Sequence, residues 1–210
     1  MNSESIANSI PNTMTNTMTK VAWSAGNWFT QPPRVVFEGE AMIVDAAPES
    51  DLWRNTSYGF VHNSAHALLT DFPDQTAVEV SFILDLKGQF DQAGVLVRAD
   101  DEHWTKAGIE FAEGALQIGA VVTAINSDWS TWPQDEWSGK EVTIRASRSG
   151  DALTIRAKAV DEKDWQLVRV APIDPSLDWK AGPHLACPLK GELQIKFTNF
   201  TKGPADASLH

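Results

Sequence analysis

Short segments that alternate apolar and polar residues recur along most of this sequence. From Trp23 onward they return about every ten residues, and Gly, Pro, Asn and Asp separate them. No stretch places its apolar residues at the helical period of about 3.6. The pattern predicts an all-β chain folded as a two-sheet antiparallel β-sandwich of the jelly-roll type.

The clearest strands are predicted where the alternation is longest. They span Val78 to Lys87, Gln92 to Arg98, Trp104 to Phe111, Ala115 to Ile125, Glu141 to Ser147, Ala152 to Ala159, Trp165 to Val170 and Glu192 to Phe200. Shorter strands are predicted for Arg34 to Phe37, Ala41 to Val44, Tyr58 to His62 and His66 to Asp71. The turn composition Arg148-Ser149-Gly150-Asp151 predicts a hairpin between two of the longer strands.

The two ends of the chain differ from the middle. Residues 1–20 are rich in Ser, Thr and Asn and have no sustained apolar period, so they bury too little surface to offset the entropy of ordering. We expect a disordered tail over residues 1–20, a single sandwich domain over 21–202 and a short tail over 203–210.

Charge and hydropathy favour some partners over others. The 17 basic and 28 acidic side chains leave a net charge of −11, which repels nucleic acid phosphates and anionic lipid surfaces. The apolar runs are far shorter than the roughly 20 residues that span a bilayer, and the start of the chain lacks the order of a signal peptide. We expect a cytoplasmic protein with neither a nucleic acid nor a membrane partner.

The cysteine and histidine pattern does not indicate a metal site or a cofactor. A single cysteine, Cys187, cannot form an internal disulfide. His184 is three residues earlier, on the opposite face if both lie in a strand, so Cys187 is interpreted as a small buried or groove-lining residue and not as a nucleophile. His62 and His66 flank a predicted turn but lack a carboxylate partner, and we interpret them as surface residues.

The register of three neighbouring strands can be predicted from their turns. A two-residue turn at Glu113-Gly114 pairs Gly108 with Gly119, and a symmetric loop over Ala99 to His103 pairs Gly94 with Gly108. One face is then apolar and suited to packing on a second sheet: Ala93, Val95, Val97, Ala107, Ile109, Phe111, Leu116, Ile118, Ala120 and Val122. On the other face the three glycines lie side by side, where a groove would form.

Polar side chains border the predicted glycine groove. Amide, carboxylate, ammonium and indole groups together suit a polyhydroxylated ligand, because hydroxyls need donors and acceptors while a sugar face stacks on an aromatic ring. Alternatively, Trp side chains from the polar, loop-like segment Ser127 to Trp132 fold over the glycines and fill the groove. The candidate ligand-binding residues are Trp53, Arg54, Gln92, Gly94, Arg98, Trp104, Lys106, Gly108, Glu110, Gln117, Gly119 and Trp129. No residue is assigned a catalytic role.

Several motifs also indicate a family. They are Asp91 to Arg98, Trp104 to Phe111 and Ser127 to Ser130, supported by Asp51 to Thr56, Tyr58 to Phe60 and Gly182 to Pro188. In this order they resemble the regulation of enolase protein 1 family, from Trp23 to Phe200. The resemblance implies a concanavalin A-like lectin/glucanase fold and says little about activity, and carbohydrate binding follows from the fold only by analogy.

Three functions of different classes therefore stay open. The first is a non-catalytic module that binds a carbohydrate or another small polar ligand. The second is a regulatory domain that binds a protein partner, as the family name suggests. The third is a glycoside hydrolase, which needs a second carboxylate near Glu110. Glu113 falls on the opposite face, so that carboxylate would have to be Asp91 or Asp128, reaching in from a loop.

Overall fold

The structure is a computed structural model that describes residues 17–209. Its strands are β1 (Thr19–Lys20), β2 (Asn27–Trp28), β3 (Arg34–Glu38), β4 (Ala41–Asp45), β5 (Leu52–Arg54), β6 (Val61–Asn63), β7 (His66–Asp71), β8 (Thr76–Ile83), β9 (Gln92–Arg98), β10 (His103–Ala112), β11 (Ala115–Ala124), β12 (Asn126–Pro133), β13 (Glu141–Ser149), β14 (Ala152–Ala159), β15 (Gln166–Pro172), β16 (Lys180–Ala186) and β17 (Gln194–Pro204). Two short 3-10 turns span η1 (Trp23–Ala25) and η2 (Asp135–Trp137).

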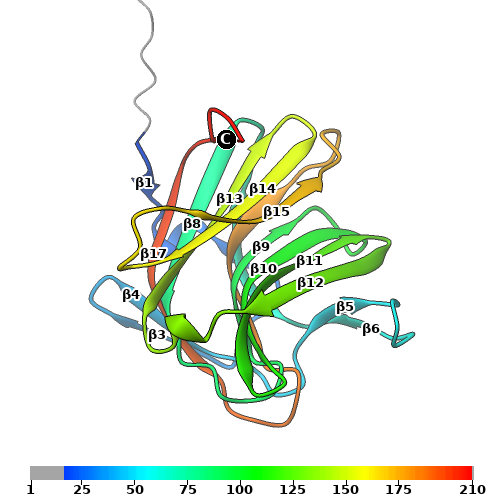
Figure 1. The fold of residues 1–210 in the computed structure, drawn as a ribbon, viewed down its shortest axis with the longest axis vertical. Helices are drawn as coiled ribbons and strands as arrows, with labels where there is room; N and C mark the ends of the chain where they lie inside the picture. Colours follow the sequence, from blue (N-terminus) through cyan, green and yellow to red (C-terminus); the bar gives the residue numbers. More distant parts are fainter. Residues whose placement is uncertain (1–16, 210) are drawn as a thin grey trace, which may run out of the picture.

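Two antiparallel sheets form the sandwich, as the sequence predicts (Figure 1). One runs β15-β14-β13-β8-β17-β4-β3, with β1 added to β17, and the other runs β12-β11-β10-β9-β16-β7-β2. Strands β5 and β6 form a separate hairpin that projects beyond β12 (Figure 1). None of the described helices is long and apolar enough to cross a membrane.

The core lies between the two sheets and contains the predicted apolar face. Val95, Val97, Ile109 and Ile118 are completely or almost completely buried there, against β8 and β13 residues such as Val80. Burying apolar surface contributes about 25 cal/mol per Å², so this layer is the main source of stability.

The strand predictions differ from the structure in several places. The strand predicted for Tyr58 to His62 begins only at Val61, as β6, and β2 and β5 were not predicted. The segment Ser127 to Trp132, predicted as a loop, lies inside edge strand β12 and pairs with β11. Its two tryptophans lie on opposite sides of the strand: Trp132 packs against the core, and Trp129 lies on the outer face beside Trp53. Strand β16 was not predicted, since Gly182-Pro183 interrupts its apolar pattern.

The ends of the chain also differ from the prediction. Residues 1–16 and His210 lie outside the described residues, but Thr19 and Lys20 pair with β17 as strand β1. At the other end β17 runs to Pro204, and the Asp206 carboxylate accepts a 2.8 Å hydrogen bond from Arg145 Nε. The sheet therefore includes residues that the sequence placed in both tails.

The β5–β6 hairpin covers part of the outer face of the seven-stranded sheet. The Arg54 backbone N–H donates to Ser127 Oγ at 2.9 Å, and its guanidinium binds the Ile125 carbonyl and the Glu102 carboxylate. Under the hairpin a second apolar cluster is buried: Leu52, Trp53, Ala65, Ala67, Leu69, Leu96, Trp104, Val121 and Ala186. The hairpin therefore covers part of this sheet face and forms one side of a cleft on it.

Candidate functional site

A cleft of about 350 Å³ opens between the β5–β6 hairpin and the outer face of the seven-stranded sheet. Its lining combines aromatic rings with a few polar groups: Asp51, Trp53, Tyr58, Phe60, His62, Phe90, Gln92, Lys106, Glu110, Val121, Trp129, Pro188 and Leu189. A mostly apolar cavity with a few converging polar groups is the usual form of a small-molecule site.

The aromatic wall comes from the hairpin and from β12. The Trp53 ring lies edge-on to Tyr58 at 5.5 Å and to Trp129 at 6.4 Å between centroids, and Phe60 stacks on Tyr58. Trp53 is buried and its indole N–H donates to the Thr56 carbonyl, which fixes its orientation. Tyr58, Phe60 and Trp129 stay exposed at 58%, 41% and 40%, so this wall offers ring faces to a ligand.

A partly buried ion pair forms the polar base of the cleft. Lys106 Nζ, on β10, donates to Asp51 Oδ1 at 2.9 Å, and the Leu52 backbone N–H donates to the same oxygen at 2.7 Å. The Gln92 amide lies 3.5 Å from this oxygen. Because Asp51 pairs with Lys106 and its carboxylate oxygen accepts these hydrogen bonds, Asp51 holds the hairpin to the sheet.

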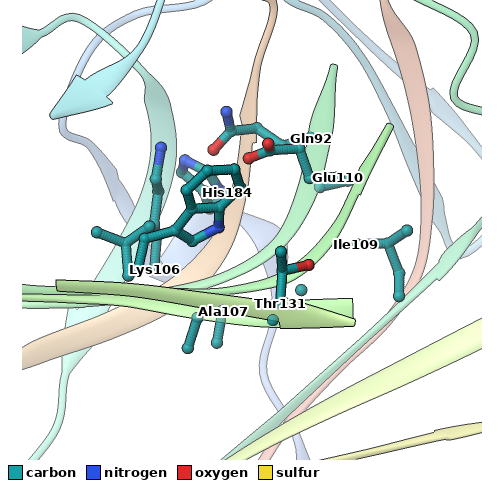
Figure 2. A pocket seen from close by; sticks show the side chains of 13 residues that line it. Gln92, Lys106, Ala107, Ile109, Glu110, Thr131 and His184 are labelled. Carbon is teal, nitrogen blue, oxygen red and sulfur yellow. The ribbon is translucent and has the colours of Figure 1, made fainter. Parts of the chain in front are cut away.

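The Glu110 carboxyl points into the same cleft without a partner. Within residues 17–209 it takes part in no hydrogen bond or ion pair, although Gln92 and Lys106 lie on neighbouring positions of the face (Figure 2). Burial raises the pKa of Glu110 to about 7; Lys106 opposes this shift and the Asp51 charge adds to it. Near neutral pH the group therefore donates or accepts hydrogen bonds.

The glycine row has the predicted register. Gly108 pairs with Gly94 on one side and with Gly119 on the other. Glycine is required at these positions because neighbouring backbone lies too close for a side chain. An ideal Cβ on Gly108 would lie 2.1 Å from the Ala93 carbonyl oxygen, and one on Gly94 would lie 2.1 Å from the Ala107 carbonyl oxygen. The glycines let neighbouring strands approach, so the row does not by itself mark a ligand groove.

The space above the glycines is small. A recess of about 30 Å³ lies there, lined on one side by Trp129 and Thr131 and on another by His184 (Figure 2). Side chains thus fill most of the predicted groove, as the alternative interpretation expected. The larger cleft lies beside the row, and Gln92, Lys106 and Glu110 line both spaces.

Two buried histidines near the cleft have different surroundings. His66 Nε2 accepts the Ala47 N–H at 2.9 Å, so its Nδ1 carries the proton and donates to the Thr30 carbonyl at 3.1 Å. His184 is 2% exposed, and its Nε2 is buried without a hydrogen-bond partner. Burial holds the pKa of His184 well below its usual range, with the Lys106 charge acting in the same direction.

Comparisons with known proteins show to which family the chain belongs. The family model described as "Protein of unknown function (DUF1349)" matches residues 28–205. The chain belongs to the DUF1349 family. It is 32% identical over 188 residues to regulation of enolase protein 1 of Saccharomyces cerevisiae, covering 89% of this chain and 94% of that protein, which confirms the resemblance.

Solved structures extend the comparison of this DUF1349 chain. A functionally unknown protein from Saccharomyces cerevisiae aligns with a TM-score of 0.83 and 31% identity over 89% of this chain and 100% of that one. A xylan β-1,4-xylosidase from Bacillus halodurans C-125 aligns with a TM-score of 0.63 and 13% identity, over 92% of this chain and 41% of the enzyme. The second likeness shows the sandwich fold alone.

Some predicted site residues lie outside the cleft of the DUF1349 chain. Arg54 faces the β11–β12 turn, and Arg98 forms an ion pair with Asp101 and covers the Phe29 ring. Trp104 is 1% exposed in the second apolar cluster. Gln117 donates to the Ala112 carbonyl and accepts from Thr131. Arg98, Trp104 and Gln117 were grouped with the cleft because strand parity shows the face of a residue but not what covers it, whereas Arg54 was named from the Asp51 to Thr56 segment.

Trp53, Gln92, Lys106, Glu110 and Trp129 line the cleft as placed by the sequence. Residues that the sequence did not assign to it are Asp51, Tyr58, Phe60, His62, Phe90, Thr131, His184, Pro188 and Leu189. Seven of them, all but His62 and Phe90, either fall in the segments that carry the family resemblance or, like Thr131 and Leu189, directly follow one. Their position in or next to the family segments was the sequence signal that could have assigned them to the cleft.

The surroundings of Cys187 and of the nearby carboxylates do not favour a nucleophile or a second catalytic carboxylate. Cys187 is buried, and burial, followed by the nearby Asp91 carboxylate, raises the pKa of its thiol to about 11. Asp91 accepts the Gly88 N–H and Asp128 pairs with Arg169, so both carboxylates are engaged away from Glu110. Within residues 17–209 no three His, Cys, Asp or Glu side chains are grouped to hold a metal ion.

Proposed function

We propose that this protein binds a small polyhydroxylated ligand, of the carbohydrate class, in the cleft between the β5–β6 hairpin and the sheet. The observation that carries this proposal is the arrangement of exposed rings opposite polar groups. Tyr58 and Trp129 offer faces for stacking, while the unpartnered Glu110 carboxyl and the Gln92 amide offer hydrogen bonds from the cleft base.

The electrostatics favour a neutral ligand. Lys106 is already matched by Asp51, so a bound anion would face two carboxyl groups with one shared cation. A cation would meet the same Lys106 ammonium. Hydroxyl groups both donate and accept, and they suit a base that contains an amide, a carboxyl and an ammonium group.

Binding without covalent chemistry fits the state of the two carboxyl groups. A glycosidase needs one carboxyl as an acid and a second as a free base or nucleophile. The Asp51 oxygen that faces Lys106 accepts hydrogen bonds from both the Lys106 ammonium and the Leu52 N–H, so it is held in place and already engaged. We therefore favour a binding module over a hydrolase.

Removing one ring tests the proposal. Isothermal titration of the wild type with methyl β-D-glucopyranoside and a panel of other glycosides should give millimolar binding to at least one. Trp129→Ala should weaken that binding about tenfold, because stacking on an exposed indole is lost. Trp165→Ala removes an indole that stacks with Lys158 outside the cleft and should bind as the wild type does. The absence of binding to every glycoside would overturn the proposal.

A protein partner is the second candidate. The yeast relative is named for regulation of enolase, and the exposed Tyr58, Phe60 and Leu189 form an apolar rim that a protein surface would cover. Binding to a protein would require this rim, whereas sugar binding requires the cleft base. Glu110→Gln would then leave protein binding nearly unchanged, and Phe60→Ser would weaken it.

A further inference from the structure

Polar side chains from several strands line the recess above the glycine row. It is lined by backbone of Gly108 and Gly119, by Thr131 and Trp129 on the side of β12, and by the His184 imidazole on the side of β16. Gln92, Lys106, Glu110, Val121 and Trp129 line both the recess and the larger cleft, so the recess is an inner extension of that cleft. Figure 2 shows Gln92, Glu110, Lys106 and His184 around one space, while Ala107 and Ile109 point to the opposite side of the strands.

One group in this recess lacks the partner that its burial demands. His184 is 2% exposed, and its Nε2 has no hydrogen-bond partner in the described part of the chain. Leaving a buried polar atom unpaired costs about 1–3 kcal/mol, which is why nearly all such atoms find a partner. His66, by contrast, has both of its ring nitrogens paired within the fold.

The size and charge of the recess define what enters it. A volume of about 30 Å³ holds one water-sized group and no sugar ring. Glu110 beside it disfavours an anion, and Lys106 disfavours a cation. A neutral imidazole has one donor and one acceptor nitrogen, so its natural partner is a hydroxyl.

We infer that the recess is a subsite for the exocyclic hydroxymethyl group of a sugar, bound through its hydroxyl to His184. This inference rests on the proposed carbohydrate binding and specifies its substrate class as hexopyranosides rather than pentopyranosides. The ring stays in the outer cleft against Trp129, and only the hydroxymethyl group passes over Gly108.

Two glycosides that differ only in this group test the inference. Methyl β-D-glucopyranoside carries the hydroxymethyl group, and methyl β-D-xylopyranoside has a hydrogen in its place. In isothermal titration the wild type should bind the glucoside about tenfold or more tightly than the xyloside, because the site contains a polar group that only the glucoside satisfies.

Variants of the recess separate this role from a structural one. His184→Leu should reduce the ratio of the two affinities to about one. Because that buried substitution can impair folding, Thr131→Leu gives a second route: its longer side chain on an edge strand fills the recess and should also abolish the preference. Thr154→Leu is the control, since it makes the same replacement on β14 of the other sheet, away from the recess, and it should keep the preference.

The outcomes distinguish the two proposals. Equal affinities for both glycosides in the wild type, or an unchanged preference in Thr131→Leu, would overturn the hydroxymethyl subsite and leave carbohydrate binding intact. Lack of binding to either glycoside and to the rest of the panel would overturn carbohydrate binding itself, and the subsite with it.

Discussion

Replacing Gly108 with alanine is expected to lower the free energy of unfolding by about 3 kcal/mol or more, and Tm by about 10 °C. The added methyl group would lie 2.1 Å from the Ala93 carbonyl oxygen and 2.7 Å from the Gly94 Cα, and both are backbone atoms of a central strand. Backbone in the middle of a sheet cannot move aside without breaking ladder hydrogen bonds. Urea denaturation of the purified variant measures the loss.

Gly191 provides the matched control. An alanine Cβ there would have its nearest contact, Cys187 Sγ, at 3.6 Å, which is ordinary van der Waals contact. Gly191→Ala should change the free energy of unfolding by less than about 0.5 kcal/mol. A Gly108→Ala variant as stable as Gly191→Ala would show that the strands are not closely apposed at the glycine row.

Replacing Glu110 with glutamine is expected to stabilise the fold in a pH-dependent way. Burial raises the pKa of Glu110 from 4.5 to about 7 in the folded state, so the folded protein holds this proton more tightly than the unfolded chain does. The contribution of Glu110 to wild-type stability therefore falls as the pH rises from about 4.5 to about 7, and stays at the lower level above that. The loss amounts to about 3 kcal/mol.

Glutamine cannot ionise and avoids this loss. The difference in unfolding free energy between Glu110→Gln and the wild type should move in favour of the variant by about 3 kcal/mol between pH 4.5 and pH 8. Lys106, Asp51, His62 and Tyr58 face the same cleft and are unchanged in the variant, so they contribute to both proteins. Glu113→Gln at the exposed hairpin turn controls for removal of a carboxylate. A pH-independent difference for Glu110→Gln would mean that its carboxyl is well solvated.

The same variant changes ligand binding for a different reason. Glu110 and Lys106 flank Gly108 on one strand face, too far apart for an ideal ion pair, so the sequence predicts that Glu110→Gln changes folding little and ligand binding strongly. In the structure Lys106 is 6% exposed and paired with Asp51, and Glu110 is partly buried. Stability and binding therefore have to be measured separately, with binding compared at a pH where both proteins are fully folded.

The sandwich and the register of β9, β10 and β11 could be predicted because they depend on local signals. Alternation assigns each side chain to a face, and the short turn at Glu113-Gly114 fixes the pairing. The cleft depends on contacts between distant parts of the chain. Arg54 and Ser127 are 73 positions apart, and Lys106 and Asp51 are 55 apart. No periodicity in the sequence indicates that these segments meet.

Two rings of the aromatic wall, Tyr58 and Phe60, were missed for a related reason. The hairpin loop turns through residues with positive φ, including Asn55, Ser57 and Gly59. The sequence pattern does not reveal this turn, so Tyr58 was predicted in a strand and not over a cleft. Trp104 shows the opposite error, since it lies on the predicted face but beneath the hairpin. Strand parity predicts the face on which a side chain lies, and only the tertiary fold decides whether that face stays open.

The most direct test of carbohydrate binding in this cleft uses the indole N–H groups. The protein has nine tryptophans, and each gives one indole signal in a ¹H–¹⁵N NMR spectrum. On titration with methyl β-D-glucopyranoside, the signals of Trp53 and Trp129 should shift and saturate together. Those of Trp137 and Trp179, which donate to Glu162 and to the Asp174 carbonyl far from the cleft, should stay in place. Saturating shifts of Trp137 or Trp179, with Trp53 and Trp129 unmoved, would contradict the assignment of the binding site to this cleft.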